Sequence, residues 1–209
     1  MCGIAGFLDR SYHADAEACR RLAQTMGATL HHRGPDDAGV WVDGDAGVAL
    51  AHRRLAIIDL SAAGHQPMPS SCGGYVIAYN GEIYNAPELR RELMEQGRTF
   101  RGHSDTEVIV EGCAVWGVRE TVRRLIGMFA FALWNNQDRT LTLARDRLGI
   151  KPLYWAKFGE LSHRVSQVKL VYVQPGLLRF RRCLRSRARR CIMGFGTKPP
   201  IVHSVLATQ

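Results

Sequence analysis

A cysteine at position 2, at the head of an apolar segment, constrains this chain more than any other feature. The segment holds Ile4, Ala5, Phe7 and Leu8 and predicts a strand that ties the terminus into a sheet. Initiator methionine is generally removed before a small residue, so Cys2 would carry both a thiol and a free α-amino group. That amine has an ordinary pKa of about 7.7–8.0 and can act as a base. The pattern indicates an N-terminal nucleophile; on this segment alone, an incidental cysteine at a frayed terminus stays open.

The positive charge of the chain is confined to its last quarter. The formal net charge is +9, from 28 Lys and Arg against 19 Asp and Glu. Residues 1–158 contain 18 of each kind, whereas residues 159–209 contain ten basic residues and a single acid, Glu160. Such asymmetry marks two regions of different character. We predict a domain at residues 2–158 and a basic, arginine-rich tail at 159–209, either the product of a shifted reading frame or a disordered segment.

Composition excludes several classes of protein. No apolar run approaches the roughly 18–20 residues that span a bilayer, so no membrane association is expected. No basic region followed by an apolar one marks a signal peptide. The six cysteines form no C-x-x-C pair or disulfide framework, which favours a reducing cytoplasm.

Strand and helix patterns alternate in blocks along the first 158 residues. Helical periodicity predicts helices over residues 15–30, 85–95, 104–115 and 121–126. Asn85 is expected to cap the second of these helices, and Ser104 with Glu107 to form a capping box on the third. Strands are predicted at residues 40–42, 47–52, 75–79, 128–134 and 140–144. Hairpins with helices inserted in blocks favour an α+β layered domain over a doubly wound parallel sheet.

Several polar residues have both a structural and a functional interpretation. Arg54 is either a solvated strand end or a guanidinium that grips a carboxylate. Asn80-Gly81 is either a hairpin turn or a pair of donors for a tetrahedral oxyanion. Asp105 either favours a helix dipole or holds a substrate ammonium. His31 and His32 lack a third ligand at a metal-site spacing, so no metal is predicted.

Seven motifs, in order, resemble one family. They are Met-Cys-Gly-Ile-Ala-Gly, His-Arg-Gly-Pro-Asp, His-Arg-Arg-Leu-Ala-Ile-Ile-Asp, Tyr-Asn-Gly-Glu-Ile-Tyr-Asn, Ser-Asp-Thr-Glu, Gly-Met-Phe-Ala-Phe-Ala and Ala-Arg-Asp-Arg-Leu-Gly-Ile-Lys-Pro-Leu-Tyr. Over residues 2–155 the chain resembles the glutaminase domain of glutamine-hydrolysing asparagine synthetases, which are class II glutamine amidotransferases. The resemblance implies a four-layer αββα sandwich of the N-terminal-nucleophile hydrolase type.

The same resemblance implies roles for individual residues. Cys2 would attack the side-chain amide of glutamine and form a thioester, with Asn80 and Gly81 as the oxyanion hole. Arg54 would bind the α-carboxylate, while Asp105 and Glu82 would engage the α-ammonium. Further residues would line the substrate pocket with their backbone, and these are Leu55, Ala56, Ile57 and Ile58. The resemblance assigns no contact to His32 or Arg33.

One part of the family pattern, the synthetase domain, has no counterpart in these residues. Family members continue into a synthetase domain that uses ATP and Mg²⁺, and its Ser-Gly-Gly-x-Asp-Ser pyrophosphate loop is missing from these residues. We therefore expect the glutaminase half-reaction, with L-glutamine as substrate and no cofactor. A separate synthetase chain or a homo-oligomer stays open as a partner, and nucleic acid is not expected. The alternatives are a glutaminase that serves another ammonia acceptor, and an inactive fragment with a basic nucleic-acid-binding tail.

Overall fold

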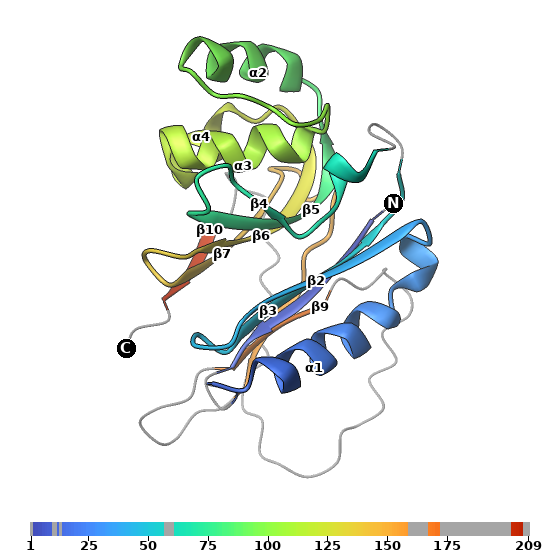
Figure 1. Ribbon diagram of the computed structural model, residues 1–209. Coiled ribbons are helices and arrows are strands. Elements are labelled where there is room, and N and C mark those ends of the chain that lie inside the picture. The colour runs from blue at the N-terminus through green and yellow to red at the C-terminus, as the bar shows by residue number, and fades with distance from the viewer. Residues whose placement is uncertain are drawn as a thin grey trace.

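The computed structural model of the protein describes residues 2–9, 12, 14–56, 61–158, 167–171 and 202–206. Two five-stranded sheets pack face to face, and helices cover both outer surfaces (Figure 1). The predicted α+β class and the predicted four-layer αββα arrangement are both confirmed.

The N-terminal strand lies at the centre of the first sheet. The strand order is β2-β3-β1-β9-β8, and the pairs that the structure describes are antiparallel. Gly3 pairs with Arg53, so Cys2 stands at the head of a central strand beside the end of β3. The bounds are β1 Gly3–Leu8, β2 Asp37–Asp43, β3 Val48–Arg54, β8 Trp155–Phe158 and β9 Gln167–Val171.

The second sheet carries the Asn-Gly dipeptide within a long strand. Its order is β10-β7-β6-β5-β4, and Gly81 of β5 pairs with Phe129 of β6. The hairpin expected as an alternative at Asn80-Gly81 is wrong, because β5 runs through both residues without a turn. The bounds are β4 Met68–Pro69, β5 Tyr75–Ile83, β6 Gly127–Asn135, β7 Thr140–Arg145 and β10 Val202–Leu206.

Helices lie on the outside of each sheet (Figure 1). Helix α1 covers the first sheet, while α2, α3 and α4 cover the second. Short 3₁₀ turns follow α1 and β3. The bounds are α1 Ala16–Ala28, α2 Ala86–Glu95, α3 Asp105–Trp116, α4 Val118–Arg124, η2 His31–Arg33 and η3 Ala62–Gly64.

Three apolar cores separate the four layers. Trp134, Leu50 and Ile4 lie between the sheets and are fully buried. A second core joins α1 to the first sheet through Phe7, and a third joins α2–α4 to the second sheet through Phe131. Burial of one such side chain stabilises the fold by roughly 1.5–3 kcal/mol. Both sheets are therefore held in place by apolar packing on each of their faces.

Asn85 and Ser104 are the N-cap residues of α2 and α3, as predicted, but two of the expected side-chain capping bonds are not formed. Asn85 makes no capping bond to α2; its amide donates to the carbonyl of Arg124 at 2.9 Å and accepts from the N–H of Ile126 at 2.9 Å. Ser104 does cap α3, but the Glu107 carboxylate turns away from the cap residue to accept from backbone N–H groups of residues 101 and 102. Both side chains satisfy tertiary backbone donors or acceptors that sequence periodicity does not reveal.

Candidate functional site

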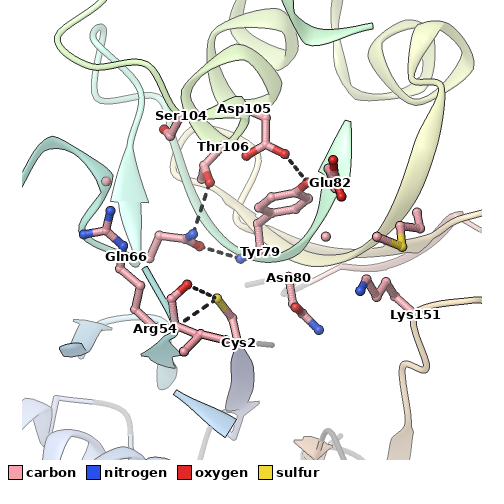
Figure 2. A pocket seen from close by; sticks show the side chains of 14 residues that line it. Cys2, Arg54, Gln66, Tyr79, Asn80, Glu82, Ser104, Asp105, Thr106 and Lys151 are labelled. Atoms are coloured by element: carbon pink, nitrogen blue, oxygen red, sulfur yellow. Dashed lines mark hydrogen bonds between the residues drawn. The ribbon is translucent and has the colours of Figure 1, made fainter. Parts of the chain in front are cut away.

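One pocket brings together residues from both sheets and from the start of α3 (Figure 2). Its volume is about 210 Å³, enough for a small molecule. Seven of the residues predicted from sequence line it, and these are Cys2, Arg54, Leu55, Asn80, Gly81, Glu82 and Asp105. The pocket also has lining residues that sequence reasoning missed, and these are Gly64, Gln66, Tyr79, Ser104, Thr106, Met128 and Lys151.

The Cys2 thiol is held by the backbone at the end of β3. Its Sγ accepts from the N–H of Leu55 at 3.4 Å and lies 3.7 Å from the carbonyl oxygen of the same residue. The next N–H, that of Ala56, donates to the Asp36 carboxylate at 2.9 Å. Ala56 is not among the described residues that line the pocket, and the predicted residues Ile57 and Ile58 lie outside the described part of the chain.

The Asn80 amide is a buried donor that faces the pocket. The residue is 2% exposed, and its Nδ2 has no hydrogen-bond partner in the part of the chain that the structure describes. Leaving a buried donor unsatisfied costs roughly 1–3 kcal/mol, and a ligand atom that accepts from it recovers that cost. Asn80 Nδ2 can therefore donate a hydrogen bond to an oxygen atom of a ligand in the pocket.

Gly81 is a glycine because β5 and β6 approach closely at this point. A Cβ added there would collide with the Met128 carbonyl oxygen and would lie 2.8 Å from Cα of Phe129. Any larger residue would therefore push the strand and its N–H out of place. The donor pair predicted at residues 80 and 81 sits on a rigid, paired strand.

A guanidinium and two carboxylates complete the polar lining. Arg54 is 8% exposed, and its Nη1 donates to the carbonyl of Ser61 at 2.9 Å. Its Nη2 lies so close to Gly64 that a Cβ there would require the guanidinium to shift. Glu82 lines the pocket from an exposed position. Asp105 lines it from the first turn of α3. This charge pattern suits a ligand that carries both a carboxylate and an ammonium group.

Asp105 is buried among donors that hold it in one orientation. Its Oδ2 accepts from the hydroxyl of Tyr79 at 2.6 Å and from the N–H of Ile83 at 3.0 Å. Burial raises the pKa of the Asp105 carboxyl above its ordinary value, and these hydrogen bonds oppose the rise. Burial beside Asp105 also raises the pKa of Tyr79 well above its usual range, so the phenol stays protonated and donates.

His52 ties the two sheets together beside the pocket. Its Nε2 lies 2.9 Å from the carbonyl oxygen of Tyr79, and since a carbonyl can only accept, Nε2 carries the proton. Burial lowers the pKa of His52 to about 4, so the imidazole is neutral near pH 7. The bond runs from β3, next to Cys2, to the residue that precedes Asn80. It therefore links the strand beside the thiol to the strand of the amide donor.

A loop after β7 supports the same wall of the pocket. The Asp146 carboxylate accepts from the N–H groups of Phe129, Ile150 and Lys151, at 3.2, 2.8 and 2.9 Å. Phe129 is the β6 partner of Gly81, so this carboxylate braces the backbone opposite the donor pair. Asp146 and Lys151 belong to the Arg-Asp-Arg-Leu-Gly-Ile-Lys motif, which was the available sequence signal for them.

Neither a metal-ligand cluster nor a membrane-spanning helix occurs among the described residues. No group of three or more His, Cys, Asp or Glu side chains there is placed to hold a metal ion. Within the same residues, no helix combines the length and the apolar character needed to cross a bilayer.

Comparison with known proteins decides the family. A family model described as glutamine amidotransferase domain matches residues 1–177. The chain belongs to this family. The match continues past residue 158 and takes in β9, while the domain boundary at residue 158 stays a prediction.

The curated relatives of this amidotransferase domain include asparagine synthetases. The chain is 40% identical over 179 residues to asparagine synthetase [glutamine-hydrolyzing] 3 of Bacillus subtilis, covering 85% of this chain and 28% of the relative. It is 41% identical over 154 residues to asparagine synthetase [glutamine-hydrolyzing] 1 of Arabidopsis thaliana, covering 74% and 25%. The chain thus spans about a quarter of the length of these relatives.

A solved structure shares the fold of the amidotransferase domain. Glutamine phosphoribosylpyrophosphate amidotransferase from B. subtilis superposes with a TM-score of 0.63 at 20% identity, covering 82% of this chain and 44% of that one. At this identity the likeness establishes the architecture alone. The N-terminal-nucleophile hydrolase fold predicted from sequence is confirmed.

Proposed function

We propose that this domain hydrolyses the side-chain amide of L-glutamine to glutamate and ammonia, with Cys2 as the nucleophile. The observation that carries the proposal is the pocket itself. It combines a thiol on the second residue of the chain with a buried amide donor, Asn80 Nδ2, that has no hydrogen-bond partner in the described residues. A nucleophile and an oxyanion donor facing one cavity are the minimum that acyl transfer requires.

The proposed chemistry begins after removal of Met1. The free α-amino group of Cys2 takes the thiol proton, and the sulfur attacks the amide carbon of glutamine. The oxygen becomes an oxyanion that accepts hydrogen bonds from Asn80 Nδ2 and the N–H of Gly81. The ammonium of Cys2 then protonates the nitrogen, the C–N bond breaks and ammonia leaves. Water attacks the resulting thioester, which releases glutamate and restores the thiol.

The charged lining would hold the amino-acid end of the substrate. The Arg54 guanidinium can fork onto the α-carboxylate, and Asp105 and Glu82 present acceptors to the α-ammonium. Hydrolysis by this route needs no metal or cofactor, because the amine supplies the base and the acid. It does need a reduced thiol, for which the cytoplasm is the fitting compartment.

The names of the relatives suggest where the ammonia goes. Because the matched relatives are called asparagine synthetases, we propose that the ammonia amidates aspartate, a step in which ATP and Mg²⁺ would act in a synthetase domain. That domain would belong to a longer chain or to a partner. A different ammonia acceptor is the alternative, and it leaves the hydrolytic site unchanged.

The test is a glutaminase assay combined with intact-mass measurement on the purified chain. We expect the mass to show loss of Met1 and the assay to show equimolar glutamate and ammonia. A folded chain that has lost Met1 yet hydrolyses no glutamine would contradict the proposal. Adding aspartate, ATP and Mg²⁺ together with a separately supplied synthetase then tests the acceptor, and asparagine is the expected product.

A further inference from the structure

The side chain of Gln66 joins two walls of the pocket. It is 5% exposed, and both ends of its carboxamide are used. Its Oε1 accepts from the N–H of Tyr79 at 2.7 Å, and its Nε2 donates to the hydroxyl of Thr106 at 3.1 Å. Figure 2 shows the carboxamide spanning from β5 to the start of α3. In the sequence, Gln66 stands in a loop segment, Gly64-His65-Gln66-Pro67-Met68-Pro69.

The first of these bonds takes the place of a strand contact. Strand β4 pairs with β5 only at Met68–Ile77 and Pro69–Val76. Extending that register by two residues places Gln66 opposite Tyr79, where a longer strand would offer a backbone carbonyl. The Gln66 side chain supplies that carbonyl instead, which leaves its amino group available for α3. One side chain thus completes the sheet edge and contacts the helix.

The bonds close into a ring. Tyr79 donates its hydroxyl to Asp105, Asp105 is bonded through the chain to Thr106, and Thr106 accepts from Gln66, which binds back to Tyr79. The hydrogen bonds of the ring measure 2.6, 2.7 and 3.1 Å, and its members are buried. Fully satisfied polar networks of this kind are stiff, since no member can move without breaking a costly bond.

The ring connects the residues next to the two substrate-binding groups. Tyr79 directly precedes Asn80, the oxyanion donor, and Thr106 directly follows Asp105, the group assigned to the α-ammonium. We propose that Gln66 is a positioning residue that sets the separation between Asn80 and Asp105, and thereby selects an amide at the length of glutamine over the shorter asparagine. This inference rests on the proposed function.

Length selection follows from the geometry that attack requires. With the α-ammonium held at Asp105, asparagine is one methylene too short for its amide to reach both the thiol and Asn80. A misplacement of about 1 Å costs roughly 10²-fold in rate, provided that the two anchors cannot approach each other. Breaking the ring lets them approach, so the penalty on the short substrate falls while the rate with the long one also falls.

The experiment compares two alkylating probes of different length on the full chain. They are 6-diazo-5-oxo-L-norleucine, which has the length of glutamine, and 5-diazo-4-oxo-L-norvaline, which is one methylene shorter. In each, the thiol proton of Cys2 moves to the diazo carbon, the S–C bond forms and N₂ leaves. The measured quantity is the ratio of the two alkylation rates at Cys2, read by mass. As a ratio, it is independent of the fraction of chain that is folded.

Thr106→Val keeps the side-chain shape and removes the hydroxyl that Gln66 binds, whereas Thr106→Ser keeps the hydroxyl. We expect the wild-type chain to favour the longer probe by about 10²-fold, and Thr106→Val to lower that preference by at least about 10-fold. Thr106→Ser should keep the preference within about 3-fold of the wild-type value, clearly less than the 10-fold change expected for Thr106→Val. Gln66→Met, which removes both bonds, should behave as Thr106→Val.

Equal slowing of both probes in Thr106→Val and Gln66→Met, with the preference intact, would overturn the inference and leave Gln66 a purely structural residue. Failure of the proposed function gives a different result: the wild-type chain would hydrolyse no glutamine. A wild-type chain that hydrolyses glutamine but shows no preference between the probes would also overturn the inference.

Discussion

The wall that carries Asn80 and the wall that carries Cys2 are held by different kinds of contact. Around Asn80, buried side chains bind one another and the backbone, as in the ring through Gln66, Tyr79 and Asp105. At Cys2, the described partner of the thiol is the backbone of Leu55. The proposed oxyanion donor is thus held in place before substrate binds, whereas the proposed nucleophile is the second residue of the chain, and its amine becomes free only when Met1 is removed.

Because of this difference, substitutions in the two walls should affect catalytic rate and folding stability differently. A change at Cys2 should remove the reaction with little effect on the fold, because Cys2 is only partly buried and its thiol contacts are long. Changes that break the buried hydrogen bonds of the opposite wall should alter the rate and the folded state together, since that wall is part of the packed second sheet.

The largest effect is expected for Cys2→Ala. Loss of a covalent nucleophile should lower glutamine turnover by at least about 10⁴-fold. Thermal unfolding should shift little, since Cys2 is only partly buried. Cys72→Ala is the matched control, because Cys72 is an exposed thiol away from the pocket and its removal should leave turnover unchanged. Equal loss in both variants would show that the effect is not specific to the N-terminal thiol.

Asn80→Ala should give the next largest loss. Removing one oxyanion donor typically costs roughly 10²–10³ in kcat. KM for glutamine should change much less, because the donor acts mainly on the charge that forms during the reaction. Steady-state kinetics separate the two constants. A rise in KM with kcat unchanged would mean that Asn80 binds the ground state and is not an oxyanion donor.

The neutral His52 predicts a loss of stability in acid. Its ordinary pKa of 6.5 applies to the unfolded chain, and burial lowers the folded value to about 4. The unfolded chain therefore binds the proton first, so stability from this residue is complete above pH 6.5 and falls as pH drops towards 4. The total is about 3 kcal/mol at 1.36 kcal/mol per pH unit. Denaturant unfolding across this range measures it.

The control for that prediction is His52→Gln, whose amide N–H can donate to the Tyr79 carbonyl but does not titrate. The difference in pH slope between the two chains isolates the histidine from the carboxylates that titrate nearby. Equal slopes between pH 4 and 6.5 would contradict a buried, neutral His52.

Asp105→Asn should have the smallest effect on rate. The amide oxygen can still accept from Tyr79 and Ile83, so the wall stays in place, while the negative charge that faces the substrate is lost. We expect KM for glutamine to rise by about 10-fold, or 1.4 kcal/mol, with kcat nearly unchanged. A large fall in kcat with KM unchanged would place Asp105 in the chemistry and not in binding.

Sequence motifs pointed to Cys2 and to Asn80-Gly81, but not to Gln66, whose side chain joins two walls of the pocket. Cys2 and Asn80-Gly81 stand in short, unusual patterns, Met-Cys-Gly and Tyr-Asn-Gly-Glu, and they line one pocket, while their catalytic roles stay predictions. Gln66 lies in a loop without periodicity, and its role depends on the β4–β5 register, which no local pattern encodes. The capping box failed for the same reason, because Glu107 satisfies backbone donors at residues 101 and 102 that periodicity does not reveal.

The layered fold was predictable because apolar alternation and helical periodicity report burial directly. Strand β1 is buried along its whole length, as its nearly continuous apolar residues indicate. Which strand lies at the centre could not be predicted, since that depends on pairings between segments far apart, such as β1 with β9.

The most direct test of a glutamine-hydrolysing N-terminal thiol is to find the acyl group on it. Rapid acid quench of the purified chain during turnover with glutamine, followed by peptide mass mapping, should show a γ-glutamyl group on the peptide that begins at Cys2. The group should disappear in Cys2→Ala together with turnover. Glutamate formation that continues in Cys2→Ala, or an acyl group found on another residue, would contradict the central claim.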